Sequence, residues 1–168
     1  MPDIAIRKAE STDFARVVEI NTEAVQHTSL MDLARLTELD ALSCYHKVLS
    51  VDGRIAGFLL AMRDNAKYPN DNFAFFASRY DCFVYVDRIV VDPAFSGLSI
   101  GSLLYKDLFQ FAVDNAVPVV ACEYNIEPPN EPTRRFHDKF GFTEIGKQWL
   151  DDGKKRVSLQ VANINTTI

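Results

Sequence analysis

The sequence predicts a mixed α/β fold, in which a sheet of parallel and antiparallel strands is flanked by helices. Residues 84–124 show the pattern strand, helix, strand, which favours a parallel pair joined by a right-handed crossover. Asp52-Gly53 and "DDGK" each separate two alternating apolar runs, which is typical of antiparallel hairpins. The expected order is therefore β-α-α-β-β-β-α-β-α-β-β in one mixed sheet.

Length and composition are those of a globular protein. The chain has 168 residues, of which 48% are hydrophobic and 24% charged, so we expect a single domain over residues 1–168. The net charge of −5 argues against general nucleic-acid binding and suits a cationic substrate such as an amine. The N-terminus lacks the apolar core of a signal peptide, and no apolar run reaches the roughly 18 residues of a membrane span. We therefore expect a cytoplasmic protein with no membrane or nucleic-acid partner.

The three cysteines do not form a recognisable pattern. Cys44, Cys82 and Cys122 are odd in number and widely spaced, which fits neither a disulfide framework nor a zinc site. Cys122 lies in "PVVACEY" and is typical of a buried strand. We expect core packing for all three and no bound metal.

In the first half, "DIAIRKA" alternates and predicts a strand. Ser11 or Thr12 is expected to cap the next helix, whose apolar face includes Phe14, Val17, Val18, Asn21 and Val25. A second helix is expected within Leu33–Tyr45, and a hairpin follows. Arg63–Asp81 is irregular with one short helix, and its aromatic part, Phe73–Tyr80, is compatible with an acceptor-pocket wall, a core patch or a dimer contact.

In the second half, Cys82–Val91 is the clearest strand, and Asp92-Pro93 ends it. The next helix is expected from about Ile100 to Asn115, followed by the buried strand "VVACEY". "TRRFHDKF" predicts a short helix with Gly141 as its C-cap, and a hairpin closes the chain.

The stretch "DPAFSGLSIGSLL", residues 92–104, places small residues at the start of a helix. A helix N-terminus has unpaired N–H groups and a partial positive charge, so it binds phosphate readily. The candidates for such contacts are Ser96, Gly97, Ser99, Gly101 and Ser102. The stretch lacks the Gly-Lys-Ser/Thr of a nucleotide P-loop and the three glycines of a dinucleotide site. The alternative is a tight turn that binds nothing.

At this point the sequence resembles the GCN5-related N-acetyltransferase (GNAT) superfamily. Its central motif is a strand ending in Val-x-Pro, then Arg/Gln-x-x-Gly-x-Gly/Ala at the start of a helix, and "IVVDPAFSGLSIGSLL" matches the strand, the proline and the spacing. Gly101 takes the last glycine position, and Gly97 a position that is often glycine. Ser96 replaces the usual Arg or Gln, and Ser99 a usual Gly.

A second block supports the resemblance. "NEPTRRFHDKFGF" is similar to the family's Asn followed by "LYEKLGF", with Asn130, Phe136, Lys139, Gly141 and Phe142 in matching places. His137 stands at the usual tyrosine position. Since "IRKAESTDF" and "VDGRIAGFLL" also resemble the family's start, the resemblance covers nearly the whole chain.

The resemblance implies a central, mostly antiparallel twisted sheet flanked by helices, and acetyl-CoA as the cosubstrate. The pyrophosphate is expected on Ser96, Gly97, Leu98, Ser99, Ile100, Gly101 and Ser102. The pantetheine arm is expected on the backbone of Ile89, Val90 and Val91, where an N–H would also stabilise the thioester oxygen. Coenzyme contacts are further implied for Asn130, Phe136 and Lys139, and Lys106, Arg134 and Arg135 are candidates to reach the phosphates.

A proton must leave the attacking amine, and Glu123 is the first candidate for the general base. It ends a strand that should border the coenzyme, and partial burial would raise its pKa. Asp87 is the second candidate, with a structural salt bridge or a solvated position as the alternative. His137 is the candidate acid for the thiolate, with Tyr124 and Tyr85 as replacements or a purely polar role as the alternative. His27 and His46 are expected to be structural.

The function that fits best is an acetyl-CoA-dependent N-acetyltransferase that acts on a primary amine. The acceptor class stays open between a small molecule, a peptide N-terminus and a lysine. The alternatives are a non-catalytic sensor of CoA or acyl-CoA and a protein-interaction module with an empty loop. A homodimer is also compatible with the sequence.

Overall fold

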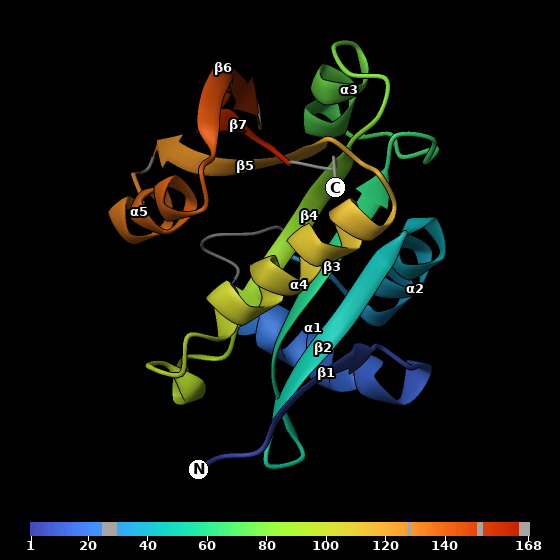
Figure 1. Cartoon of the computed structure of the whole chain (residues 1–168), viewed down its shortest axis with the longest axis vertical. Helices are drawn as coiled ribbons and strands as arrows, with labels where there is room; N and C mark the ends of the chain where they lie inside the picture. Colours follow the sequence, from blue (N-terminus) through green and yellow to red (C-terminus); the bar gives the residue numbers. More distant parts are fainter. Residues whose placement is uncertain (25–29, 128, 151–152, 165–168) are drawn as a thin grey trace. The chain divides into compact units, whose positions relative to one another are not determined.

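The computed structural model describes residues 1–24, 30–127, 129–150 and 153–164 (Figure 1). Val25, His27 and the Asp151-Asp152 part of the last predicted turn lie outside the described residues. The elements are β1 (Ile4–Lys8), a 3₁₀ turn (Ser11–Asp13), α1 (Phe14–Glu23), α2 (Leu33–Leu42), β2 (Tyr45–Val51), β3 (Arg54–Arg63), α3 (Asp71–Ala77), β4 (Val84–Val91), a 3₁₀ turn (Pro93–Phe95), α4 (Ile100–Asp114), β5 (Val119–Glu127), α5 (Glu131–Lys139), β6 (Thr143–Leu150) and β7 (Lys155–Asn163).

The strands form a seven-stranded mixed sheet in the order β1-β2-β3-β4-β5-β7-β6. β4 and β5 are parallel, whereas the pairs β1–β2, β2–β3, β5–β7 and β6–β7 are antiparallel. This confirms the predicted fold class and the predicted order of elements. The chain divides into two compact units, Met1–Met62 with Asp87–Gln110 and Arg63–Val86 with Phe111–Ile168, so that β4 and α4 each contribute to both.

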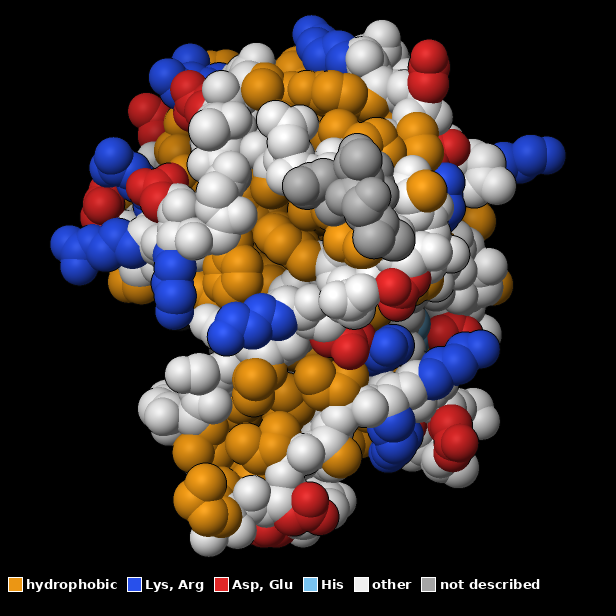
Figure 2. All heavy atoms as spheres, in the orientation of Figure 1, with side chains coloured by type: hydrophobic (Ala, Val, Ile, Leu, Met, Phe, Trp, Pro, Cys, Tyr) orange, Lys and Arg blue, Asp and Glu red, His pale blue; other side chains and the backbone are white. Residues whose placement is uncertain are grey.

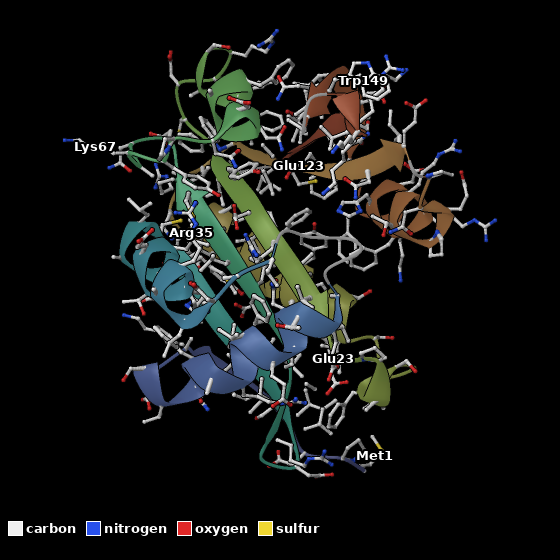
Figure 3. The ribbon with its side chains drawn as sticks, turned by 180° about the vertical axis from the view of Figure 1, so that it is seen from behind. Met1, Glu23, Arg35, Lys67, Glu123 and Trp149 are labelled. Carbon is white, nitrogen blue, oxygen red and sulfur yellow. The ribbon has the colours of Figure 1, made fainter. Side chains whose placement is uncertain are left out.

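In the first unit, β2 and β3 form the predicted hairpin. Asp52 and Gly53 both have positive φ, 50° and 81°, as a two-residue hairpin turn of this kind requires. Helices α1 and α2 cover one face of the strands of this unit, and the start of α4 covers the other (Figures 1 and 3). Val17, Ile20 and Leu104 are fully buried, which confirms the predicted apolar faces of α1 and α4.

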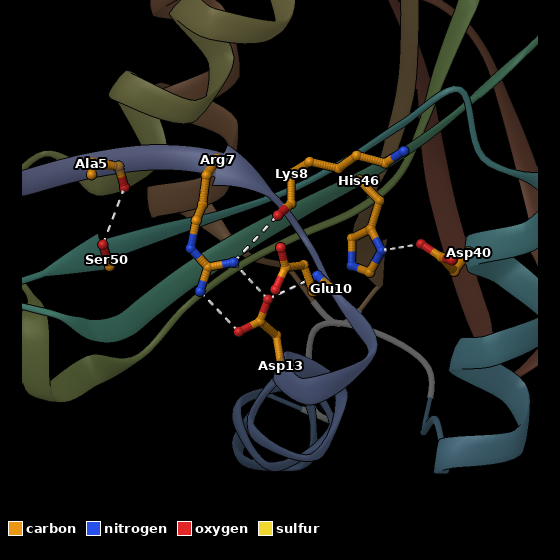
Figure 4. Close-up of polar contacts among 8 residues, drawn as sticks. All are labelled: Ala5, Arg7, Lys8, Glu10, Asp13, Asp40, His46 and Ser50. Atoms are coloured by element: carbon orange, nitrogen blue, oxygen red, sulfur yellow. Dashed lines mark hydrogen bonds and ion pairs between the residues drawn. The ribbon is translucent and has the colours of Figure 1, made fainter.

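The start of α1 differs from the prediction of a Ser11 or Thr12 cap, which is wrong. Asp13 Oδ2 accepts from the Glu10 N–H at 2.8 Å, so a carboxylate stabilises the turn that leads into the helix. Both oxygens of Asp13 also accept from the Arg7 guanidinium, at 2.7 and 2.9 Å (Figure 4). The paired guanidinium lowers the pKa of Asp13 and ties β1 to the helix entry.

The second unit contains the antiparallel strands β5, β7 and β6 together with α3 and α5. Phe73 and Phe76 of α3 are buried and pack against Tyr85, with ring centroids 5.8 and 5.9 Å apart. Of the three interpretations of the aromatic segment, these two rings fit the core patch. The other end of this unit carries exposed Trp149 on β6 (Figure 3).

The surface shown in Figure 2 mixes acidic and basic side chains and has no continuous basic face. In the described parts of the chain, no helix is long and apolar enough to cross a bilayer. The same residues contain no group of His, Cys, Asp and Glu that could hold a metal ion. Cys122 is buried as expected, while Cys44 and Cys82 are only half-buried.

Candidate active site

The first part of the candidate site is the backbone of β4. The Asp92 N–H donates to the Ala56 carbonyl of β3 at 2.8 Å, and the Val90 carbonyl also lies against β3 at Gly57. Since the polar backbone groups of a strand alternate between its two sides, Ile89 and Val91 direct theirs to the opposite side. The ladder to β5 covers only Val84 and Tyr85. Two of the three residues predicted to pair with pantetheine therefore present their backbone away from β3, and Val90 presents its backbone toward it.

The loop after β4 has the conformation of an exposed cradle at a helix start. Asp92 Oδ1 accepts from the Ala94 N–H at 3.0 Å, and the Asp92 carboxylate also pairs with Arg16 of α1, which fixes the loop's first turn. Gly97 has φ 88° and Ser99 has φ 58°, both in the left-handed region. Ser96, Gly97 and Ser99 are exposed, so their backbone is accessible. Ser99 thus adopts a conformation that glycine prefers, and it does so where the family pattern has Gly.

The loop leads directly into α4, whose first residue packs on the sheet. Ile100 is buried, and the Ser99 carbonyl accepts from the Leu103 N–H at 3.0 Å. Gly57 of β3 makes this approach possible, because a Cβ there would lie 3.0 Å from Ile100 Cγ2 and 3.0 Å from the Val90 oxygen. Gly101 and Ser102 follow in the first turn, where Ser102 is buried. The sequence offered no signal for the role of Gly57.

Asp87 lies at the start of this part of β4, in a buried polar cluster. Its Oδ2 accepts from Arg88 Nε at 2.7 Å, and Arg88 Nη1 donates to Asn21 Oδ1 of α1 at 3.1 Å. The Asp87 and Arg88 side chains are only 4% and 7% exposed. This arrangement corresponds to the structural salt bridge that was the alternative to a base, and it anchors β4 to α1 through groups that keep each other paired.

Glu123 lies on β5 in the second unit (Figure 3). It is half-buried, and its Oε2 accepts from the Tyr85 hydroxyl at 2.7 Å. Tyr85 itself is fully buried among the rings of Tyr68, Phe73 and Phe76, so the hydroxyl is held in place. An O–H donor on the carboxylate suits its ionised form, which only accepts hydrogen bonds. Tyr85, one of the two replacement acids, thereby has its hydrogen directed at Glu123.

His137 lies on α5 and is buried against β5. Its ring contacts those of Tyr124, Phe136 and Phe142, with centroids 5.1, 5.5 and 5.4 Å away. Nδ1 donates to the Thr133 carbonyl at 2.7 Å, since a carbonyl oxygen only accepts. Burial lowers the pKa of His137, so the neutral ring prevails at neutral pH. The charged imidazolium, on which the prediction of an acid was based, is therefore disfavoured here.

The remaining predicted contacts of α5 surround this histidine. Asn130 is the N-cap of the helix, and its Oδ1 accepts from the Thr133 N–H at 3.3 Å. Phe136 is half-buried and packs on Phe140, with centroids 5.3 Å apart, while Lys139 is exposed. Asn130 is thus a helix-positioning residue in this structure, and coenzyme contacts by these three residues stay predictions.

A pocket of about 550 Å³ lies beside α5 within the second unit. Glu131, Arg134 and Asp138, spaced along one face of α5, form one wall. Tyr124 of β5 and Gln160 of β7 are also among its lining residues. The sequence motifs pointed to Asn130 and His137 in this region, but they gave no indication of Gln160.

The structure therefore brings the predicted residues together in two groups, each within one unit. Asp87, Ile89, Val90, Val91 and the loop residues Ser96–Ser102 share the first unit, and Glu123, Asn130, Phe136, His137 and Lys139 share the second. The residues that sequence reasoning missed are those that support these groups: Gly57, Arg88, Asn21, Arg16 and Gln160.

Comparisons with known structures agree on the fold. The ribosomal-protein-S18-alanine N-acetyltransferase of Escherichia coli aligns with TM-score 0.75 and 15% identity, over 99% of this chain and 97% of that one. Ard1 of Thermoplasma volcanium aligns with TM-score 0.77 and 17% identity, over 96% and 97%. The yncA protein of Salmonella typhimurium, solved with acetyl-CoA, aligns with TM-score 0.71 and 21% identity, over 98% and 95%.

A search of curated proteins returns no match to this sequence. A family model described as "Acetyltransferase (GNAT) family" matches residues 6–142, which include β4, the loop, α4, Glu123 and His137. Because this match covers most of the chain and the fold agrees, the chain belongs to the GNAT family of acetyltransferases.

Proposed function

We propose that this protein transfers the acetyl group of acetyl-CoA to a primary amine. The observation that carries the proposal is the continuous path in the first unit, from the side of β4 facing away from β3 into an exposed loop with two left-handed residues at the start of α4. In a member of the GNAT family, this path supports binding of an extended cosubstrate that ends in a pyrophosphate.

The residues of the loop suit a pyrophosphate without a formal positive charge. Ser96, Gly97 and Ser99 are small and exposed, and the first turn of α4 adds unpaired N–H groups. Ser96 stands where the family usually has Arg or Gln, so we expect backbone amides and hydroxyls to carry the binding. Acetyl-CoA supplies the activated acyl group; the chain's contribution at β4 is the backbone of Ile89 and Val91, which can pair with an amide-containing arm.

Glu123 is the side chain best placed to act as the general base. A base must be ionised and accessible, and Glu123 is half-exposed with one oxygen accepting from the Tyr85 hydroxyl. Asp87 by contrast is bound to Arg88 and nearly inaccessible, so proton uptake there would break a buried ion pair. These differences favour Glu123 as the residue that takes the proton from the attacking amine.

Isothermal titration calorimetry with acetyl-CoA tests the proposed cradle. Gly101→Asp places a carboxylate in the first turn of α4, and we expect at least a tenfold loss of affinity through repulsion of the pyrophosphate. Gln110→Glu adds the same charge at an exposed position farther along α4 and serves as the control. Equal affinity of Gly101→Asp and the wild type would contradict the cradle.

A further inference from the structure

A chain of hydrogen bonds connects β6, β7 and β5 within the second unit. The Ser158 hydroxyl donates to Glu144 Oε2 at 2.5 Å, Gln160 Nε2 donates to Ser158 Oγ at 2.6 Å, and Gln160 Nε2 also donates to the Tyr124 hydroxyl oxygen at 3.2 Å. Ser158 is fully buried and Gln160 is 3% exposed, so the chain is shielded from water. Tyr124, at its end, lines the pocket beside α5.

The carboxylate at the other end fixes the direction of this chain. Glu144 can only accept, so Ser158 uses its hydrogen on Glu144 and must accept from the amide. Gln160 therefore presents its NH₂ group to both Ser158 and Tyr124. This orientation leaves the Gln160 Oε1 atom buried without a hydrogen-bond partner, which is costly and indicates that the amide is held for its donors.

The consequence for Tyr124 is a defined role as a donor. Its oxygen receives an N–H from Gln160, so its own hydrogen is directed away from that amide. Burial raises the pKa of Tyr124, which keeps the phenol protonated at neutral pH. When the phenol gives up its proton, the same Gln160 N–H stabilises the resulting phenolate.

We propose that Tyr124 supplies the proton to the departing thiolate, and that Glu144, Ser158 and Gln160 position it for this step. The proposal rests on the proposed acetyl transfer. As the bond from the amine nitrogen to the acyl carbon forms, the carbon–sulfur bond breaks and its electron pair goes to sulfur. Sulfur then takes the proton from the Tyr124 hydroxyl, and the phenolate recovers a proton from solvent. His137, which contacts the Tyr124 ring, keeps its Nδ1 hydrogen on Thr133.

A titration of tyrosine ionisation by absorbance near 295 nm tests the positioning without using activity. The difference between the wild type and Tyr124→Phe isolates the curve of Tyr124 among the six tyrosines. In Gln160→Met, loss of the N–H donor should move this curve to higher pH by about one pH unit. The matched control is Gln148→Met on β6, whose amide donates to Asn72 and not to Tyr124. An unchanged Tyr124 curve in Gln160→Met would overturn the proposal.

Steady-state kinetics tests the catalytic part. We expect Tyr124→Phe to lower kcat about a hundredfold and Gln160→Met about tenfold, with the KM for acetyl-CoA within about twofold of the wild type. Wild-type kcat in Tyr124→Phe would overturn the donor role. If the wild type itself acetylates no amine, the proposed function fails, and the titration then separately decides whether Gln160 positions Tyr124.

Glu144→Gln provides a second variant that leaves the core intact, because Glu144 is 41% exposed. An amide at this position can donate to Ser158, which allows the whole chain to reverse and Tyr124 to turn its hydrogen toward Gln160. We expect kcat to fall several-fold although Glu144 does not touch Tyr124. Unchanged kcat and an unchanged Tyr124 titration in Glu144→Gln would contradict the fixed direction of the chain.

Discussion

Glu123 is the residue on which proton removal from the amine depends most directly. Its carboxylate accepts from the buried Tyr85 hydroxyl and remains half-exposed, which suits repeated proton uptake. We expect Glu123→Gln to lower kcat at least a hundredfold near neutral pH, with an unchanged KM for acetyl-CoA. Glu127→Gln removes an exposed carboxylate from the same strand and should have no effect. Full turnover of Glu123→Gln in a thiol-release assay would make the assignment wrong.

Two buried histidines determine a pH dependence of stability. Burial lowers the pKa of His46 and His137 below the usual 6.5, so the folded chain takes up fewer protons than the unfolded chain as the pH falls. The free energy of unfolding should therefore decrease between pH 7.5 and pH 5.5. His46 carries much of this effect, because its Nδ1 contacts Asp40 at 2.7 Å while its Nε2 is buried without a partner (Figure 4).

Urea unfolding at the two pH values measures this effect. His46→Gln should show a smaller decrease than the wild type, because it removes one of the two groups that protonate more readily in the unfolded chain. Equal stability of the wild type at pH 7.5 and pH 5.5 would contradict the neutral, buried state of both rings.

At the scale of elements, α4 is placed by a glycine in a neighbouring strand. Gly57 allows Ile100 to approach β3, so Gly57→Ala should displace the helix start and raise the KM for acetyl-CoA several-fold, at a cost of about 1–3 kcal/mol in stability. Gly146→Ala is the matched control, since its Cβ would meet Phe75 Cζ at 2.8 Å within the second unit. It should destabilise the protein without changing this KM. An unchanged KM in Gly57→Ala would remove the positioning role.

The elements were largely predictable because their signals are local. The Asp52-Gly53 turn, the alternation in Cys82–Val91 and the apolar spacing of α4 each depend on neighbouring residues, and the structure confirms them. The cap of α1 was not predictable in the same way, because Asp13 is recruited by Arg7 from β1. The pairing of Asp87 with Arg88 and Asn21 likewise depends on a contact between β4 and α1.

At the scale of the whole molecule, motif spacing identified the family but not the supporting contacts. The loop after β4 and the Asn130–Phe142 block are continuous in sequence, so a pattern can capture them. Gln160 and Glu144 are 36 and 14 residues away from the partners they help to position, and no local pattern connects them. The acidic net charge of −5 remains compatible with a cationic acceptor, and it does not choose among amines.

The central claim, acetyl transfer to an amine, is tested most directly by thiol release from acetyl-CoA with a panel of small amines, peptides with free N-termini and lysine peptides. We predict release that requires an acceptor, saturates with acetyl-CoA and is lost in Glu123→Gln. The acetylated product should gain the mass of one acetyl group. Tight acetyl-CoA binding without acceptor-dependent release across the whole panel would contradict the account.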